Sequence, residues 1–122
     1  ELSDKFTGNA VRVPTPNVSL AILNINLSKE VNDVGSINEI LRYAASNGEL
    51  VEQIDYSTSE ELVSTDCIGN THAAIVDSHA TLVAPNKKSV VLYVWYDNEY
   101  GYTCQVMRLA KYIAKVQRLT YY

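Results

Sequence analysis

The sequence has little of what marks a disulfide-bonded, metal-binding or membrane-spanning protein. Its only two cysteines, Cys67 and Cys104, form no disulfide framework, and with the two histidines, His72 and His79, they fit no zinc-ligand spacing. No apolar run approaches the roughly 20 residues that a transmembrane helix needs. The first residues show neither the basic nor the apolar region of a signal peptide. Two cysteines without a disulfide framework are typical of a cytoplasmic protein with reduced thiols, which is what we expect.

Positive charge is also scarce. The net charge of −4 at pH 7 argues against a general nucleic-acid binder, which would normally be basic. Internal repeats, low-complexity tracts and linkers are absent as well, and 122 residues fit a single domain. A chain of this length can bury roughly two thirds of the surface that it exposes when unfolded. We therefore expect one globular domain that binds neither nucleic acid nor membrane.

The most hydrophobic stretch, residues 90–95, is an unbroken run of β-branched and aromatic side chains. Such a run is typical of a strand covered on both faces. It ends at three polar residues, Asp97, Asn98 and Glu99, and Gly101 is expected to relax the backbone before a long helix. A rigid strand that ends in polar side chains is how α/β scaffolds present groups to a ligand.

Shorter segments around this strand predict the rest of a sheet. Residues 18–27 change phase at Ile22 and Leu23, which predicts a bulge or burial of both faces in the first half. Residues 10–13 are a short strand or an extended crossover, because Pro14 and Pro16 remove ladder donors. Further strands are predicted within residues 50–56 and, as a pair, at residues 73–76 and 81–84.

Two helices are predicted. The first has capping-box spacing between Ser36 and Glu39, apolar residues at helical spacing after it, and a left-handed stop at Asn47 and Gly48. The second runs over residues 101–119. Its apolar face consists of Tyr102, Val106, Leu109, Ile113 and Val116, and a basic stripe of Arg108, Lys111, Lys115 and Arg118 is expected to be solvated. The pattern predicts an α+β fold with a mixed, largely antiparallel sheet and two main helices.

Three polar residues near the strand and in the N-terminal segment are candidates for binding. Arg12, within an apolar segment, either pairs with a carboxylate or binds an anion, and the residue pattern alone slightly favours the pair. Asn98 is read as an Asx-type turn residue, and Glu99 could cap the following helix. Tyr102 is read as a core aromatic at the start of that helix.

Three separated blocks of the sequence resemble glyceraldehyde-3-phosphate dehydrogenases. Residues 95–102 resemble the signature W-Y-D-N-E-[FY]-G-Y, and residues 7–19 resemble T-G-x-A-x-R-V-P-T-x-N-V-S. Residues 63–72 resemble V-S-x-D-F-x-G-x-x-H, with Cys67 at the phenylalanine position. The blocks lie in the family's order and at about its spacing, and the resemblance as a whole covers nearly the whole chain.

The resemblance implies roles for three residues. Arg12 matches the arginine that binds the substrate's phosphate, and its planar fork of donors suits two phosphate oxygens. Asn98 matches the asparagine that binds the nicotinamide carboxamide, and Tyr102 matches a tyrosine near the nicotinamide. The family's nucleophile motif S-C-T-T-N-C and a G-x-G-x-x-G loop are absent from these residues, and neither cysteine nor histidine matches a catalytic position, so no catalytic residue is assigned.

The resemblance therefore implies that residues 1–122 are the C-terminal part of a catalytic domain, without the dinucleotide-binding domain. The parent enzyme would oxidise a phosphorylated aldehyde with NAD or NADP and inorganic phosphate, and would be a homo-oligomer. The chain alone is expected to be inactive and to bind no cofactor tightly. The alternatives are a fragment of an erythrose-4-phosphate dehydrogenase-like paralogue and a non-catalytic binding or scaffold module of the same fold.

Overall fold

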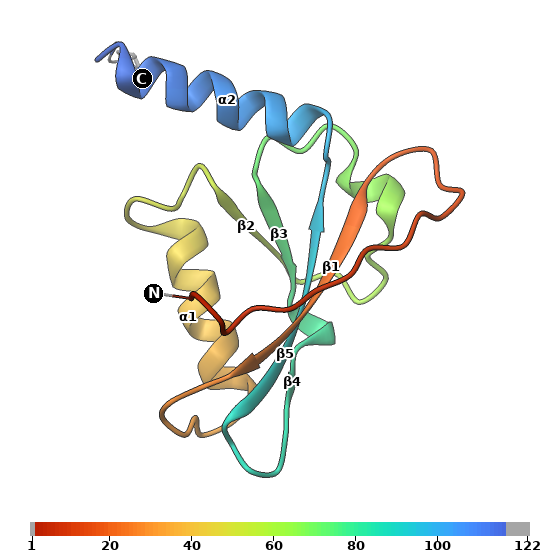
Figure 1. Ribbon diagram of the computed structural model, residues 1–122, viewed down its shortest axis with the longest axis vertical. Helices are drawn as coiled ribbons and strands as arrows, with labels where there is room; N and C mark the ends of the chain where they lie inside the picture. The colour runs from red at the N-terminus through yellow and green to blue at the C-terminus, as the bar shows by residue number, and fades with distance from the viewer. Residues whose placement is uncertain (1, 117–122) are drawn as a thin grey trace.

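A computed structural model describes residues 2–116 as a sheet with two helices (Figure 1). In chain order the elements are β1 (Ser19–Asn26), α1 (Val34–Ser46), β2 (Ile54–Ser57), the 3-10 turns η1 (Ser64–Cys67) and η2 (Ser78–Ala80) on either side of β3 (Ala74–Asp77), then β4 (Leu82–Val83), β5 (Ser89–Tyr96) and α2 (Tyr100–Ile113). The sheet order is β1-β5-β3-β2, and β4 also pairs with β5. Only the β2–β3 pair is parallel, which confirms the predicted α+β fold with a largely antiparallel sheet.

β5 is the central strand, but a helix covers only one of its faces. Val90, Leu92 and Val94 alternate along it and are at most 9% exposed. They pack against Ile37 and Leu41 of α1. The opposite face is more open, because Leu20, Ile22 and Leu82 lie on it and are 38%, 52% and 54% exposed. The prediction that both faces of residues 90–95 are covered is therefore correct for the face that packs against α1 and wrong for the opposite face.

β1 is an edge strand without a bulge. Its residues pair one for one with β5, from Ser19 opposite Tyr96 to Asn26 opposite Ser89. The predicted bulge at Ile22 and Leu23 is wrong, and so is the alternative of burial on both faces, because both side chains are at least 40% exposed. The segment before β1 is extended, and residues 10–13 form no strand.

β3 and β4 do not pair with each other as predicted. Both pair with β5, β3 through Ile75 opposite Trp95 and β4 through Leu82 opposite Val91. The 3-10 turn η2 between them carries the chain onward along the same edge of β5, and the Ser78 hydroxyl anchors that turn by donating to the Ser57 carbonyl at 2.6 Å. A long central strand can thus take two short partners in succession.

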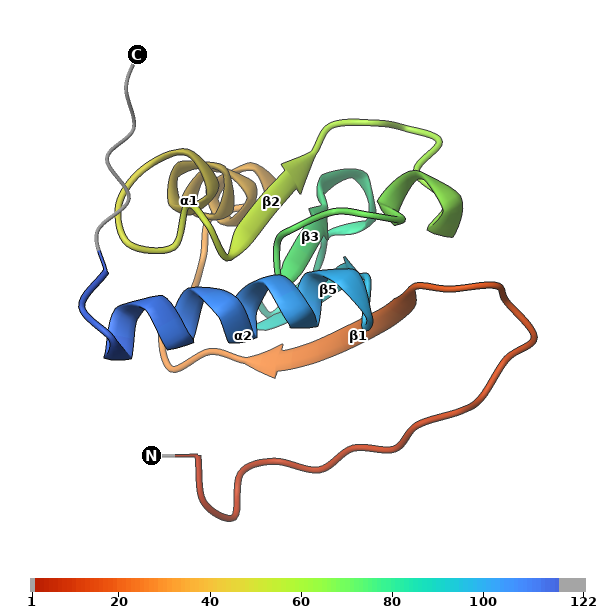
Figure 2. The same cartoon turned by 90° about the horizontal axis from the view of Figure 1, so that it is seen from above.

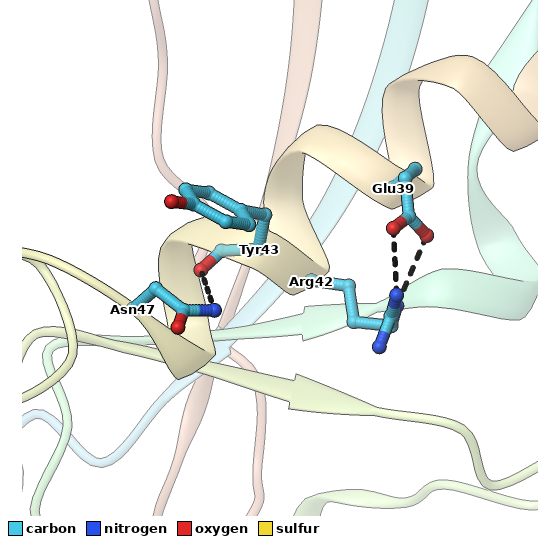
Figure 3. Close-up of polar contacts among 4 residues, drawn as sticks. All are labelled: Glu39, Arg42, Tyr43 and Asn47. Atoms are coloured by element: carbon cyan, nitrogen blue, oxygen red, sulfur yellow. Dashed lines mark hydrogen bonds and ion pairs between the residues drawn. The ribbon is translucent and has the colours of Figure 1, made fainter.

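α1 is capped by a residue that lies before the predicted start. The Asp33 carboxylate accepts a hydrogen bond from the Ser36 backbone N–H at 2.8 Å, so the capping box predicted for Ser36 and Glu39 is wrong. Glu39 instead forms an exposed ion pair with Arg42, 2.6 Å between Oε1 and Nη2 (Figure 3). At the other end Gly48 has φ of +85°, as predicted for a left-handed stop.

α2 ends at Ile113, six residues before the predicted end. Lys115 takes a left-handed conformation with φ of +54°, its N–H bonds to the Tyr112 carbonyl, and the Val116 N–H bonds to the Lys111 carbonyl. These two bonds are a Schellman stop, which usually uses glycine and was therefore not recognisable in the sequence. Arg118 and Leu119 lie outside the described residues.

Candidate functional site

The junction at the end of β5 is organised by Asp97, whose side chain is only 2% exposed. Its Oδ1 atom accepts hydrogen bonds from the backbone N–H groups of Glu99 at 3.0 Å and Tyr100 at 2.8 Å, which caps the start of α2. Its Oδ2 atom accepts from the backbone N–H of Gly69 at 2.9 Å. Asp97, and not Glu99 as predicted, is therefore the residue that caps α2, and the Asx turn belongs to Asp97 and not to Asn98.

The backbone hydrogen bonds at this junction keep Asp97 ionised. The N–H of Gly69 lowers the pKa of Asp97 most, and those of Tyr100 and Glu99 add to the effect, although burial of the carboxylate opposes it. The amide of Asn17, which lies just before β1, also lowers this pKa. One buried carboxylate thus joins the loop around Gly69 to the start of α2.

The first turns of α2 sit directly on the loop that precedes β3. A Cβ atom on Gly101 would lie 2.7 Å from the His72 carbonyl oxygen, so only glycine fits. Gly101 is helical, which corrects the prediction that it relaxes the backbone: its role is close approach. One turn later the Gln105 amide donates to the carbonyls of Glu52 and Thr71, both at 3.0 Å.

Asn98 and Tyr102 present exposed side chains at this junction. The Ser19 hydroxyl, at the start of β1, donates to Asn98 Oδ1 at 3.4 Å, so the amide lies beside the edge of the sheet. Tyr102 follows in the first turn of α2 and is 69% exposed, so it is not the core aromatic that the residue pattern suggested. The side chains of Asn98 and Tyr102 project from a stretch of backbone that is fixed by the hydrogen bonds of Asp97 and by the close approach at Gly101.

Arg12 lies on the extended segment before β1, which loops away from the sheet and returns to it at Ser19 (Figure 2). The ion pairs among residues 2–116 are Arg42 with Glu39 and Lys88 with Glu30, so the structural pair that the residue pattern favoured for Arg12 is not formed there. The Arg12 side chain is exposed, and no hydrogen bond between described residues brings it to Asn98 or Tyr102.

The thiols and histidines of the described chain do not form a nucleophile with its base. Cys67 is 1% exposed, and burial, together with Asp66, Asp55 and Asp77, raises its pKa to about 11. His72, in the loop before β3, bonds to Asn70, and His79, in η2, bonds to the Thr58 carbonyl. Within residues 2–116 no three histidine, cysteine, aspartate or glutamate side chains are grouped closely enough to hold a metal ion.

Two surface hollows flank the loop that carries Cys67. The first, about 460 Å³, is lined by polar groups of residues 55–59 and by Cys67 and Ile75. The second, about 400 Å³, opens at the Asp97 junction between Asn17, Gly69 and Thr103.

None of the helices formed by the described residues has the length and apolar character that crossing a membrane requires.

Sequence reasoning missed two residues that build this junction, Gly69 and Gln105, and it also missed the role of Asp97, whose Oδ2 atom binds Gly69. Only the polar character of residues 97–99 pointed to the place, because each missed contact joins residues far apart in the chain. For Gly69 the available signal was its place in the resembling block of residues 63–72, with a φ of +78° in the structure.

Comparisons with known proteins converge on one family. A family model described as "Glyceraldehyde 3-phosphate dehydrogenase, C-terminal domain" matches residues 1–98. A "Glyceraldehyde-3-phosphate dehydrogenase-like protein" of Pseudomonas aeruginosa strain UCBPP-PA14 is 55% identical over 94% of the chain and 24% of its own length. The glyceraldehyde-3-phosphate dehydrogenase of Glossina morsitans morsitans is 44% identical over 93% of the chain and 33% of its own length. Glyceraldehyde-3-phosphate dehydrogenase 2 of Bacillus subtilis strain 168 is 42% identical over 93% of the chain and 32% of its own length. The chain thus spans between 24% and 33% of the length of these relatives.

Proposed function

The chain belongs to the glyceraldehyde 3-phosphate dehydrogenase family, and on that premise we propose that it forms the C-terminal part of the catalytic domain of a phosphorylating aldehyde dehydrogenase. That enzyme oxidises a phosphorylated aldehyde, glyceraldehyde 3-phosphate first among the candidates, with NAD or NADP and inorganic phosphate. The proposal includes a dinucleotide-binding domain outside these residues and a cytoplasmic location.

The observation that carries the proposal is the exposed Asn98 amide on the anchored end of β5. An amide both donates and accepts hydrogen bonds, so it suits a carboxamide such as that of the nicotinamide ring. The backbone on either side of Asn98 is held by Asp97, so the amide has a defined starting point. Tyr102, exposed one turn into α2, offers an aromatic wall beside it. These features fit a nicotinamide, which when bound would accept the hydride of the aldehyde.

Arg12 is proposed as the phosphate ligand. Its side chain is exposed, and no carboxylate among the described residues occupies its guanidinium. A guanidinium without a protein partner can give both of its parallel N–H groups to phosphate oxygens. The extended segment that carries it returns to the sheet at Ser19, which contacts Asn98. The resemblance of residues 7–19 and 95–102 to the family supports, for the complete enzyme, one site that holds phosphate and nicotinamide.

We propose that the 122 residues alone do not catalyse and bind no cofactor tightly. They contain no S-C-T-T-N-C motif, and the thiol of Cys67 is buried and protonated at neutral pH. The assay is reduction of NAD or NADP by glyceraldehyde 3-phosphate with inorganic phosphate. Reduction above that of a heat-inactivated sample would contradict the proposal.

The site residues are tested in the full-length enzyme. Arg12→Ala should lower kcat/KM for the phosphorylated aldehyde about ten- to a hundredfold, because each lost charge-assisted bond is worth roughly 1.5–3 kcal/mol. Arg42→Ala is the matched control, since Arg42 is exposed and pairs only with Glu39 within α1. An Arg12→Ala enzyme with the kcat/KM of the control would reject Arg12 as a phosphate ligand.

A homo-oligomer is also proposed, with the open face of the sheet as its contact. Leu20, Ile22 and Leu82 form an exposed apolar surface there together with the half-buried Val91 and Tyr93. Burial of such side chains stabilises association by about 25 cal/mol per Å² before its costs. Light scattering at micromolar concentration should show a multiple of the chain mass, and Ile22→Asp should reduce it. A strict monomer would contradict this proposal.

A further inference from the structure

The two oxygens of the Asp97 carboxylate serve two different parts of the molecule. Oδ1 accepts from Glu99 and Tyr100, which is all that a helix cap requires. Oδ2 accepts from Gly69, which lies 28 residues earlier in the chain. A helix cap alone does not explain this second bond, because Gly69 belongs to the loop between η1 and β3.

The bond to Glu99 encloses Asn98. Because Oδ1 of Asp97 bonds to the N–H of Glu99, the closed ring of this Asx turn contains the peptide groups on both sides of Asn98. The backbone of Asn98 is thereby restrained while its own side chain stays exposed. The position of the Asn98 amide follows from where the Asp97 carboxylate sits.

The loop that receives the second bond is itself braced. The Asn70 amide donates to Asp55 of β2 at 2.8 Å, and the His72 N–H donates to Asn70 Oδ1 at 2.9 Å. Gly69 presents its N–H from a left-handed conformation with φ of +78°. Asp97 therefore joins the backbone of Asn98 to a loop that is tied to the sheet, and not to a free surface loop.

We propose that Asp97 is a positioning residue for cofactor binding: by spanning Gly69 and the start of α2, its carboxylate sets the place of the Asn98 amide that receives the nicotinamide. This inference rests on the proposed function. Asn98 makes the contact with the cofactor, and Asp97 holds Asn98 in the position that this contact requires.

The test variant is Asp97→Asn, which keeps the side-chain volume and one acceptor oxygen. That oxygen can still cap Glu99 and Tyr100, but the new NH2 group then faces the Gly69 N–H, so two donors meet. In the full-length enzyme the KM for NAD or NADP should rise about tenfold, while the KM for the phosphorylated aldehyde should change less than about twofold. A merely structural role would lower activity without this difference between the two KM values.

Asp66→Asn is the matched control. It removes a carboxylate from η1, three residues before Gly69, but among the described residues the Asp66 carboxylate bonds only to the Val63 N–H. In the 122-residue chain, amide hydrogen exchange of Gly69 should be at least about tenfold faster in Asp97→Asn than in Asp66→Asn, while Tyr100 stays protected. Equal exchange at Gly69 in both variants would overturn the inference.

Asn98→Ala separates this inference from the proposed function. If Asn98→Ala raises the KM for the cofactor and Asp97→Asn does not, the positioning role is wrong and the function stands. If neither variant changes that KM, the assignment of Asn98 fails as well. Should Asp97→Asn not fold, Asp97→Ser keeps a capping oxygen that is too short to span both partners, and it should show the same rise in KM. Failure of both variants to fold would overturn the positioning role in favour of a purely structural one.

Discussion

Replacement of Gly101 by alanine tests how α2 is seated on the sheet. In the middle of an exposed helix, replacing glycine by alanine raises the free energy of unfolding by about 1 kcal/mol, because alanine is the better helix former. Here the new Cβ would lie 2.7 Å from the His72 carbonyl oxygen and 3.3 Å from that of Asn70. Both are backbone atoms, so neither can rotate away, and α2 or the loop must move.

The cost of that movement exceeds the gain in helix propensity. Forcing an extra carbon into a close contact costs roughly 1–3 kcal/mol. The shift also lengthens the Gln105 bonds to Glu52 and Thr71, each worth about 1 kcal/mol. After the propensity gain is subtracted, Gly101→Ala should lower the free energy of unfolding by about 1–2 kcal/mol. For a domain of this size that lowers the Tm by roughly 3–6 °C.

Gly35→Ala is the matched control in α1. Its Cβ would meet only the carboxyl group of Asp33, with Oδ1 at 3.4 Å and Cγ at 3.9 Å, so the stability of this variant should be unchanged or up to about 0.5 kcal/mol higher. Urea unfolding followed by circular dichroism measures both variants. If Gly101→Ala were as stable as Gly35→Ala, the close approach of α2 to the His72 carbonyl would be refuted.

Three further predictions concern the thiols, the buried carboxylate and the core. Because the pKa of Cys67 is raised to about 11, roughly one thiol in a thousand is ionised near pH 8, so a disulfide reagent should modify Cys104 first and Cys67 only after denaturant is added. The lowered pKa of Asp97 means that its carboxylate stabilises the fold above its unfolded pKa near 3.9 and that this stabilisation is lost as pH falls through the lower, folded pKa. Urea midpoints of the wild type and Asp97→Asn should therefore differ at about pH 6, and the difference should shrink as the pH falls below about 4; a constant difference would contradict the ionised state. Val90→Ala should cost about 2 kcal/mol, whereas Ile22→Ala, at an exposed position, should cost well under 1 kcal/mol in the monomeric chain, and equal losses would contradict the assignment of the core face.

Local pattern was enough for the elements that carry most of the fold. The apolar run of residues 90–95 predicted β5, because β-branched and aromatic side chains at that length favour an extended buried strand. Residues 18–27 predicted β1 to within one residue at each end, and Gly48 marked the end of α1. The three blocks that resemble the family are also local, so the sequence alone predicts the family, and the family model confirms it.

The sequence prediction was wrong at places where a second residue or strand could make the same contact as the predicted one, or where a helix ended without its usual residue. Ser36 and Glu39 have capping-box spacing, but Asp33 lies three residues earlier and its carboxylate takes the Ser36 N–H. Lys115 ends α2 in a left-handed conformation, which glycine usually adopts at that position, so the sequence carries no signal for this end. Residues 73–76 and 81–84 are neighbouring strands in sequence, which favours pairing with each other, but the long strand β5 pairs with both.

Sequence by itself therefore determined the family, the fold class, the central strand and the three residues proposed for binding: Arg12, Asn98 and Tyr102. Tertiary structure alone decided how Asn98 is held, because Gly69 reaches Asp97 from 28 residues away and the His72 carbonyl reaches Gly101 from 29 positions earlier. The periodicities of helices and strands arise from the backbone geometry of a few consecutive residues, so such patterns can be read along the chain. A buried carboxylate that bridges two distant backbone segments has no period and no spacing of its own, because its partners become neighbours only after the sheet has formed.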